Sequence, residues 1–475
     1  MKHIANLLLL MACVIAGVTD TCRADVAIAT APSLLQPDAA IATFDTDVDL
    51  PEAKLVSARV SRDPAAFAGA GSLRIVFHAT EPVVPPTLRL PITAGIDSGR
   101  TDAISFHARA ADGGAQKDVR VRIGLCNSSG RQIMQRPVTI PADNQWHPVS
   151  VSLERFRWGE IAGGWNEARS VQIIIESSFS SIWFDEVKLV PRGPDAVLPK
   201  DRLRKLAFAE RDARSAEGDG LFVATDAADL TEADMLRILG NMKRTRSLVR
   251  RLFGDAVRPI DAAPPAALLI FKDQPGYSVF WQNMGSQWGA RILPPQSGGY
   301  TVQDIATTTF DPKLGNDRPV WLHESAHAIV GRDLRLAPGT IAHSWLQEGL
   351  ANYIQLCVYP NSLDNGAYPR LFAAGVQDLP QALFRPLKSV LSERVTTQQY
   401  AQLASLTAYL IEAHPDWLPK IASGLADATP VDKVFTALGT DLDALQTSWL
   451  AWGRKRFAQP RTDGHFDRPV EWNGR

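Results

Sequence analysis

The sequence predicts a multidomain protein in which an N-terminal all-β sandwich is followed by an α+β unit with a helical C-terminal part. Short segments of alternating apolar and polar residues, separated by turn residues, fill residues 25–192. Residues 220–460 contain a few short apolar segments and then long amphipathic ones, which is typical of an α+β unit. The chain has 475 residues, of which 45% are hydrophobic and 21% charged, and this is enough to fill two large cores.

The sandwich prediction rests on segments in which apolar side chains recur at every second residue, as they do in a half-buried strand. Turn residues such as Asn127-Ser128-Ser129-Gly130 separate these segments. Many short strands with hardly any helical periodicity favour two packed β-sheets. The predicted strands are 71–78, 103–109, 119–125, 146–153, 171–176 and 182–190.

Segments 71–75 and 182–190 resemble those of the jelly-roll modules called galactose-binding-like or carbohydrate-binding. The resemblance implies that the sandwich binds a glycan or another partner, and that it holds a structural calcium ion (Ca2+). Asp45, Asp47 and Asp185 are the candidate oxygen ligands. The alternative is that these three carboxylates only satisfy turns and strand edges.

The N-terminus has the layout of a secretory signal peptide, residues 1–24. A basic start precedes the apolar run 4–18, and Ala24 is a small residue at the expected cleavage site. We therefore expect an exported protein, periplasmic or extracellular. The alternatives are an uncleaved anchor or a lipoprotein modified at Cys13, since Leu10-Met11-Ala12-Cys13 loosely resembles a lipobox. No later stretch has the ~20 apolar residues of a membrane span.

The charge and the cysteine content argue against a nucleic-acid binder and against a disulfide-rich protein. Fifty Lys+Arg against 51 Asp+Glu give a net charge of −1, without the basic surplus of a nucleic-acid binder. Only Cys126 and Cys357 follow the signal peptide, in different predicted domains, so we expect two buried thiols and no disulfide framework.

The second unit begins after a predicted linker, residues 193–219, and precedes a predicted C-terminal tail, residues 461–475. Segments 221–225 and 267–271 are predicted strands, and 299–310 adds one or two more. A long amphipathic helix is predicted to begin at Thr231, and nearly everything from Pro319 onward to be helical.

One motif in this unit carries chemistry. His323-Glu324-Ser325-Ala326-His327 has the form H-E-x-x-H, in an apolar segment that Pro319 opens and Gly331 is expected to end. Residues four apart share a helix face, so both imidazoles can reach one zinc ion (Zn2+). Glu324 is rotated by about 100° from His323, where it can act on a water molecule as general base.

A second motif follows. Ser344-Trp345-Leu346-Gln347-Glu348-Gly349-Leu350-Ala351 resembles the W-L-x-E-G-x-A signature of the gluzincin metallopeptidases, and twenty residues separate His327 from Glu348. The resemblance covers about 220–460 in outline and is specific in 321–353. It implies that Glu348 is the third zinc ligand. Ser344 and Gln347 form a predicted capping box, so we expect a helix to begin there.

Other residues compete for these roles. Asp333 lies where a metzincin places its last ligand, and His343 is a further candidate for the third ligand. Asn352 lies one turn after Glu348, where gluzincins often place a polar residue that orients a ligating histidine; the alternative is a solvated amide. By similarity to M1-like aminopeptidases, Tyr400 is the first candidate donor to a developing oxyanion. Tyr353 and Tyr359 are the alternatives to Tyr400.

We therefore expect an exported zinc metallopeptidase that acts on a peptide or protein substrate. Residues matching the aminopeptidase motif Gly-x-Met-Glu-Asn are not found, which favours an endopeptidase or a specialised hydrolase. One alternative is a non-catalytic secreted protein that binds a glycan or a protein through its sandwich, with the peptidase-like unit as a scaffold. Another is a polysaccharide-active enzyme, although no spacing of acidic residues indicates one.

Overall fold

The structure is a computed structural model that describes most of the chain beyond residue 33. The expected signal peptide, residues 1–24, and Asp47 of the expected calcium site lie outside the described residues. Those residues are 34–36, 38–46, 52–54, 58–77, 85–111, 117–177, 181–193, 199–209, 211–260, 265–292, 298–314, 319–360, 368–377, 384–458 and 466–473.

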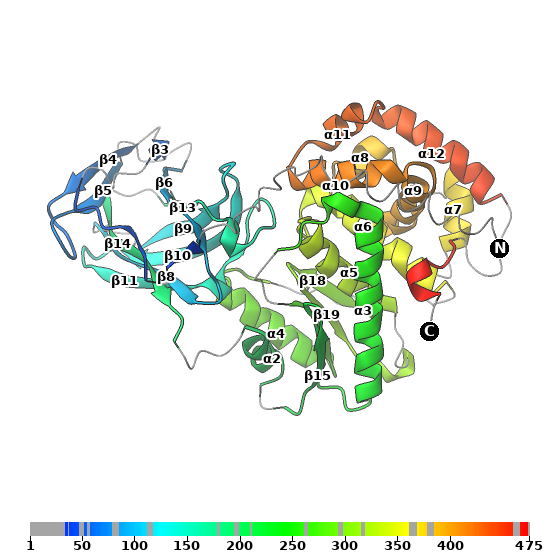
Figure 1. Ribbon diagram of the computed structural model, residues 1–475, viewed down its shortest axis with the longest axis horizontal. Coiled ribbons are helices and arrows are strands. Elements are labelled where there is room, and N and C mark those ends of the chain that lie inside the picture. Colours follow the sequence, from blue (N-terminus) through cyan, green and yellow to red (C-terminus); the bar gives the residue numbers. More distant parts are fainter. Residues whose placement is uncertain are drawn as a thin grey trace, which may run out of the picture. The chain divides into compact units, whose positions relative to one another are not determined.

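The N-terminal part consists of short strands, in blue to cyan-green in Figure 1. All six strands predicted from alternation are present, so the prediction of a β-rich part is confirmed. The strands are β1 (Leu34–Leu35), β2 (Ala40–Ala42), β3 (Glu52–Lys54), β4 (Ala58–Asp63), β5 (Ser72–Phe77), β6 (Thr87–Pro91), β7 (Gly95–Ile96), β8 (Thr101–Ala110), β9 (Asp118–Cys126), β10 (Gln132–Pro141), β11 (His147–Ser152), β12 (Arg157–Trp158), β13 (Ser170–Ile175) and β14 (Ser181–Pro191).

Within the described residues twelve of these strands form two antiparallel sheets of six strands each, and β1 and β7 form a separate parallel pair. One has the order β12-β10-β9-β13-β6-β3, and the other has the order β11-β8-β14-β5-β4, with β2 paired to β14. Their inward faces share one core, in which Phe106 of β8, Ile123 of β9 and Phe184 of β14 are at most 2% exposed. Successive side chains of a strand point to opposite faces of the sheet, so apolar residues recur at about every second position in the strands that the sequence predicted.

The second part contains a five-stranded sheet of order β15-β16-β17-β19-β18. The three central strands are parallel, and both edge strands are antiparallel to their neighbours. Its strands are β15 (Arg214–Gly218), β16 (Leu221–Thr225), β17 (Ala266–Phe271), β18 (Gly299–Val302) and β19 (Ile305–Thr309).

The expectation that residues 193–219 are a linker is wrong for much of that stretch. Helix α2 (Pro199–Phe208) and edge strand β15 occupy it, and β15 pairs with β16. The charged composition of this stretch had suggested a solvated connection. The strand has an exposed edge, so charged side chains are compatible with it.

Two helices lie between the strands of this sheet in the chain, and helices make up the C-terminal part, as the sequence predicts (Figure 1). The first begins at Thr231, whose hydroxyl accepts the amide N–H of Asp234 while the Asp234 carboxylate accepts the N–H of Thr231. Besides α2, the helices are α3 (Glu232–Phe253), which is the one that Thr231 caps, α4 (Gln274–Gln287), α5 (Pro319–Asp333), α6 (Ile341–Val358), α7 (Tyr368–Val376), α8 (Leu387–Val390), α9 (Tyr400–Ala413), α10 (Leu418–Ala426), α11 (Val431–Ala437) and α12 (Leu442–Arg456).

The helix that carries the H-E-x-x-H motif is buried between other elements. Helix α5 packs against strands β17, β18 and β19 and against helices α3 and α6. Helix α6 is itself buried around most of its circumference, with Trp345, Leu346 and Leu350 fully inaccessible. An all-round apolar helix needs neighbours on every side, so these two helices form the centre of the core.

Two helix ends differ from the sequence prediction. Helix α5 continues past Gly331 to Asp333. The expectation that helix α6 begins with a capping box of Ser344 and Gln347 is wrong, because the helix begins at Ile341 with Thr340 as its N-cap. The Ser344 hydroxyl donates to the Ile341 carbonyl one turn back, inside the helix.

Both remaining cysteines, Cys126 and Cys357, are buried free thiols. Within the described residues, no helix combines the length and the apolar character needed to cross a bilayer.

Candidate metal centre

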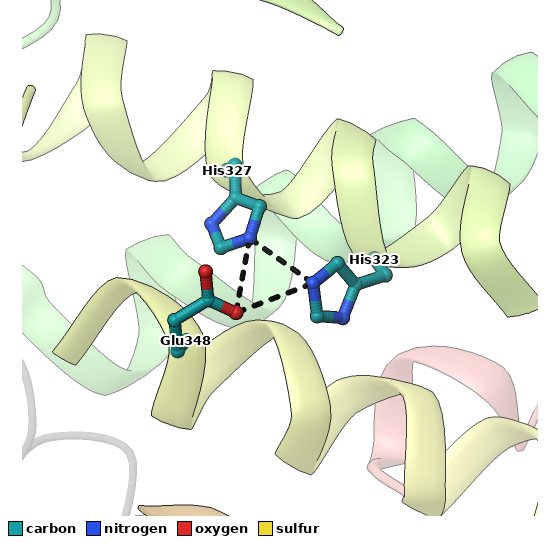
Figure 2. Close-up of side chains that lie close together, drawn as sticks. All are labelled: His323, His327 and Glu348. Atoms are coloured by element: carbon teal, nitrogen blue, oxygen red, sulfur yellow. Dashed lines mark hydrogen bonds and ion pairs between the residues drawn. The ribbon is translucent and has the colours of Figure 1, made fainter. Parts of the chain in front are cut away.

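Three side chains that could hold a metal ion meet between helices α5 and α6. His323 and His327 lie one turn apart on α5, and Glu348 reaches them from α6 (Figure 2). The two imidazole Nε2 atoms are 3.1 Å apart. The Glu348 Oε2 atom lies 3.4 Å from Nε2 of His323 and 3.5 Å from Nε2 of His327. The three donor atoms therefore form a nearly equilateral triangle.

This triangle fits a zinc ion. Zinc binds imidazole and carboxylate at about 2.0–2.2 Å in tetrahedral geometry, so two of its ligand atoms are about 3.3 Å apart. Glu348 Oε2 is buried and has no hydrogen-bond partner, although its carboxylate faces two imidazoles. A cation at the centre of the triangle would satisfy that oxygen together with both Nε2 lone pairs. The donor set is thus two neutral nitrogens and one anionic oxygen, with a fourth position left for another ligand.

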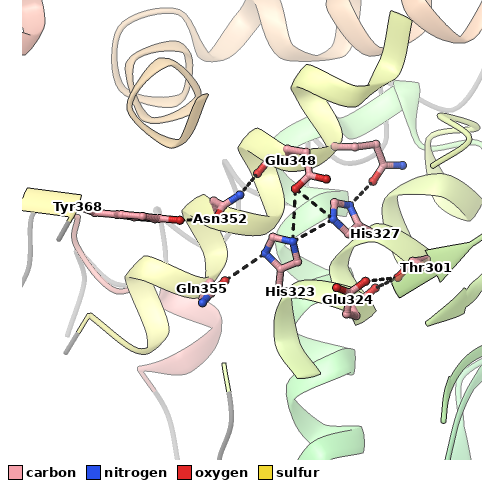
Figure 3. Close-up of polar contacts among 9 residues, drawn as sticks. Thr301, His323, Glu324, His327, Glu348, Asn352, Gln355 and Tyr368 are labelled. Atoms are coloured by element: carbon pink, nitrogen blue, oxygen red, sulfur yellow. Dashed lines mark hydrogen bonds and ion pairs between the residues drawn. The ribbon is translucent and has the colours of Figure 1, made fainter. Parts of the chain in front are cut away.

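Each histidine is oriented by a carboxamide (Figure 3). His323 Nδ1 lies 3.1 Å from Gln355 Oε1, and His327 Nδ1 lies 2.9 Å from Gln347 Oε1. Because an amide oxygen only accepts hydrogen bonds, both Nδ1 atoms carry a proton, so each ring in its neutral form presents the lone pair of Nε2 to the metal position. The Nε2 of Gln347 also donates to the Leu336 carbonyl, which fixes the amide orientation.

These two glutamines were not identified from the sequence, which pointed to Asn352 instead. The Asn352 amide donates to the Glu348 carbonyl oxygen and accepts a hydrogen bond from Tyr368 (Figure 3). Asn352 therefore contacts the backbone of Glu348 rather than either histidine of the candidate site. The spacing of Gln355, one turn beyond Asn352 on α6, is the signal that could have identified it.

The charges of the three side chains support one another. Burial alone would raise the pKa of the Glu348 carboxyl, but the adjacent His327 and His323 outweigh burial and hold this pKa far below its usual range. Burial alone would lower the pKa of His327, but Glu348 outweighs it and raises that pKa to about 9. In the metal-free protein, an imidazolium at His327 therefore neutralises the Glu348 carboxylate, as a cation would.

Glu324 lies on the side of α5 that faces strand β18. Its Oε2 accepts a hydrogen bond of 2.6 Å from the Thr301 hydroxyl (Figure 3). A side chain at Gly299 would collide with it, because a Cβ there would lie 2.4 Å from Glu324 Cγ. Burial raises the pKa of the Glu324 carboxyl, and the charges of His323 and His327 only partly oppose this. A raised pKa makes a carboxylate a stronger proton acceptor.

Of the three tyrosine candidates, Tyr400 lies beside this cluster. It is the first residue of α9, and its ring centroid is 5.8 Å from that of His323. Burial, followed by the charges of Glu348 and Glu324, raises the pKa of Tyr400, so the hydroxyl keeps its proton as a hydrogen-bond donor must. Tyr353 instead packs on Phe466, and the Tyr359 hydroxyl accepts from the Asn241 amide.

The two competitors for the third ligand position have other partners. Both oxygens of Asp333 accept hydrogen bonds from Arg246, at 2.6 and 3.0 Å. His343 Nε2 donates to the carbonyl oxygen of Leu425, at 3.2 Å. Neither side chain belongs to the group of donor atoms around His323.

No protein-family model matches the sequence, and no curated protein matches it. One similar solved structure is the family 11 carbohydrate-binding module of a cellulosomal cellulase of Clostridium thermocellum. It has 13% sequence identity and a TM-score of 0.27, over 34% of this chain and 96% of the module. The CBM22-1 xylan-binding domain of Xyn10C from Paenibacillus barcinonensis has 16% identity and a TM-score of 0.25, over 33% of this chain and 97% of that domain. An exo-β-agarase has 11% identity and a TM-score of 0.26, over 39% of this chain and 36% of its own.

The β-rich part of the chain is thus coarsely similar to carbohydrate-binding modules. The assignment of a β-sandwich rests on its own two sheets and shared core, described above.

The carboxylates of the expected calcium site have backbone partners where the structure describes them. Asp185 is fully buried and accepts hydrogen bonds from the amides of Phe67, Ala68 and Glu186. Asp45 accepts a hydrogen bond from the amide of Ala70, in the loop that also contains Phe67 and Ala68. These hydrogen bonds agree with the alternative, in which the carboxylates only satisfy turns and strand edges. Calcium binding here stays a prediction.

Proposed function

We propose that this protein is an exported zinc-dependent peptidase of gluzincin type. The observation that carries the proposal is the triangle of donor atoms from His323, His327 and Glu348, with the Glu324 carboxylate next to it on the same helix. Two independent sequence motifs supply these residues, and the fold brings them together from separate helices. A secretory leader is the basis for expecting export.

The roles of the residues follow from their chemistry. A bound zinc ion would supply Lewis acidity, which polarises a carbonyl group and acidifies a water molecule. Glu324 would take the proton of the attacking water on its carboxylate and donate it to the departing amine, as its raised pKa permits. Thr301 would hold the carboxylate in position through its hydroxyl. Tyr400 would donate a hydrogen bond to the developing oxyanion.

The test separates metal binding from catalysis. Glu324→Gln should retain about one zinc ion per chain and lose about 10²–10⁴-fold of its activity on an unstructured protein substrate, because only the proton transfer is removed. Its matched control is Glu393→Gln, a substitution on the exposed surface that should keep full activity. Undiminished turnover in Glu324→Gln would show that another group is the base.

A second candidate function is glycan binding by the sandwich, with the peptidase-like part as a non-catalytic scaffold. The similarity of the β-rich part to carbohydrate-binding modules favours it. The two functions make different predictions for the wild-type protein. A scaffold would show no zinc-dependent hydrolysis of any protein substrate, whereas a peptidase would lose hydrolysis on chelation and regain it with zinc.

A further inference from the structure

A groove lined by arginines lies on the sandwich, where strand β10 of one sheet meets edge strand β11 of the other. Its volume is about 580 Å³, within the range of sites that take small ligands or a few sugar units. Part of β9, the turn before β12, the start of β12, Glu176 and Gly289, which follows helix α4, complete its lining. Five guanidinium groups surround it, from Arg120, Arg122, Arg136, Arg155 and Arg157.

The positive charge of this groove is poorly compensated. Glu176 is the one acidic residue among the described residues that line it, and it pairs with Arg122. The Nη1 atom of Arg136 and the Nε atom of Arg157 are buried without a hydrogen-bond partner. Burial, and then the neighbouring Arg155 and Arg157, lower the pKa of Arg136. Crowded guanidinium groups destabilise one another, and an anion placed between them would remove that cost.

The rest of the lining narrows the class of anion. None of the described residues that line the groove is aromatic, so there is no ring on which a nucleic-acid base or a neutral sugar could stack. Trp183, on the outer face of the β8–β14 sheet, is covered by the guanidinium groups of Arg109 and Arg74, at 4.1 and 5.1 Å from its ring centroid. Recognition in the groove must therefore come mainly from charge and hydrogen bonds.

We propose that this groove binds an acidic glycan through its carboxylate or sulfate groups. The planar guanidinium fork matches both groups in a bidentate geometry, and five forks along one groove suit a ligand whose charges repeat. A protein partner would need aromatic or other large apolar anchors at the centre of the site, and the lining offers only small ones. The inference concerns the ligand of this groove and does not depend on the proposed peptidase activity.

Calorimetric titration of the full-length mature protein at low ionic strength tests the proposal. We expect binding of oligogalacturonate, which carries carboxylates, or of sulfated dextran fragments, and the preferred probe identifies the acidic group. Methyl-esterified oligogalacturonate has the same backbone without charge and should not bind. Binding should weaken as salt is added, because the contacts are electrostatic.

Arg120→Gln/Arg155→Gln removes two exposed charges of the groove and should weaken binding at least tenfold without changing the thermal unfolding midpoint. The matched control is Arg59→Gln/Arg100→Gln, which removes two exposed charges of the sandwich outside the groove and should bind like wild type. An equal loss in both variants would overturn the proposal. Equal affinity for the esterified probe, for oligoglutamate or for oligothymidylate would overturn the assignment to an acidic glycan.

Discussion

The two histidines of the candidate metal site are held by carboxamides rather than carboxylates. Gln355 and Gln347 fix both rings through Nδ1 without adding negative charge to a pocket that already contains Glu348 and Glu324. With neutral supports, the metal and its three ligands would carry a net charge of about +1, which favours binding of a carbonyl oxygen or an acidic water.

We predict that Gln355→Leu weakens zinc affinity by about 10–100-fold, because His323 loses the acceptor that sets its tautomer and ring orientation. Gln355→Glu keeps an acceptor at the same place and should keep the affinity near that of wild type. Competition with a chromophoric chelator measures both variants. Equal zinc affinities for the leucine variant and the wild type would rule out a positioning role.

The pH dependence of zinc binding follows from His327. Its pKa in the metal-free protein is raised to about 9, and zinc binds only the neutral imidazole. Zinc must therefore displace a proton at any pH below that value. Affinity should rise about tenfold per pH unit up to the pKa of His327 and then level off. The same competition assay at several pH values checks this, and Glu348→Gln, which removes the charge that raises the pKa, should level off at lower pH.

Some site residues could be predicted from the sequence and others could not. His323, Glu324 and His327 form one local pattern, and Glu348 lies in a second, so short windows identify them. Gln347 was instead interpreted as a capping residue, because its contact with His327 joins two helices and the sequence shows only its local neighbours. Thr301 comes from a strand that precedes the motif by more than twenty residues, and no local signal marks it.

At the scale of elements, a buried ion pair joins α3 to the end of α5. Arg246 is 12% exposed and Asp333 is 1% exposed, and the guanidinium binds both carboxylate oxygens. This pair explains why α5 continues past Gly331. The glycine was expected to end the helix, but the tertiary contact at Asp333 outweighs the local preference for a stop.

We predict that Arg246→Met lowers the free energy of unfolding by about 3–5 kcal/mol, because Asp333 is left buried without a counter-charge. Arg250→Met, four residues later on the exposed face of α3, should change it by no more than about 0.5 kcal/mol. Urea denaturation of the three proteins measures the differences. The double variant Arg246→Met/Asp333→Leu should recover much of the loss, and a loss equal to that of the single variant would contradict the explanation.

Six strands of the sandwich were predictable because apolar residues recur along them with a period of about two. Helices α2 and α4, strand β15 and several sandwich strands, among them β10, were missed. Helix α4 contains Gly276 and Gly285 and several aromatic residues, which are weak helix formers, and it is stabilised by burial of Tyr277, Phe280 and Trp281 against the sheet. Tertiary packing of this kind is not visible in a single window of sequence.

At the scale of the whole molecule, a balanced charge total conceals local imbalance. The net charge of −1 argues against a nucleic-acid binder, yet the sandwich concentrates five arginines around one groove. The division into a β-rich and a helical part was predictable from the change in periodicity. The arginine groove was not predictable, because its five arginines come from three separate strands and a connecting turn.

The central claim is that His323, His327 and Glu348 bind one zinc ion, and anomalous diffraction at the zinc absorption edge tests it most directly. Crystals of the mature protein grown with zinc should show one strong peak, about 2.0–2.2 Å from Nε2 of His323, from Nε2 of His327 and from a Glu348 carboxylate oxygen. The peak should be absent from crystals of His323→Ala. A wild-type crystal with no peak at this position, or with zinc bound by Asp333 in place of Glu348, would contradict the account.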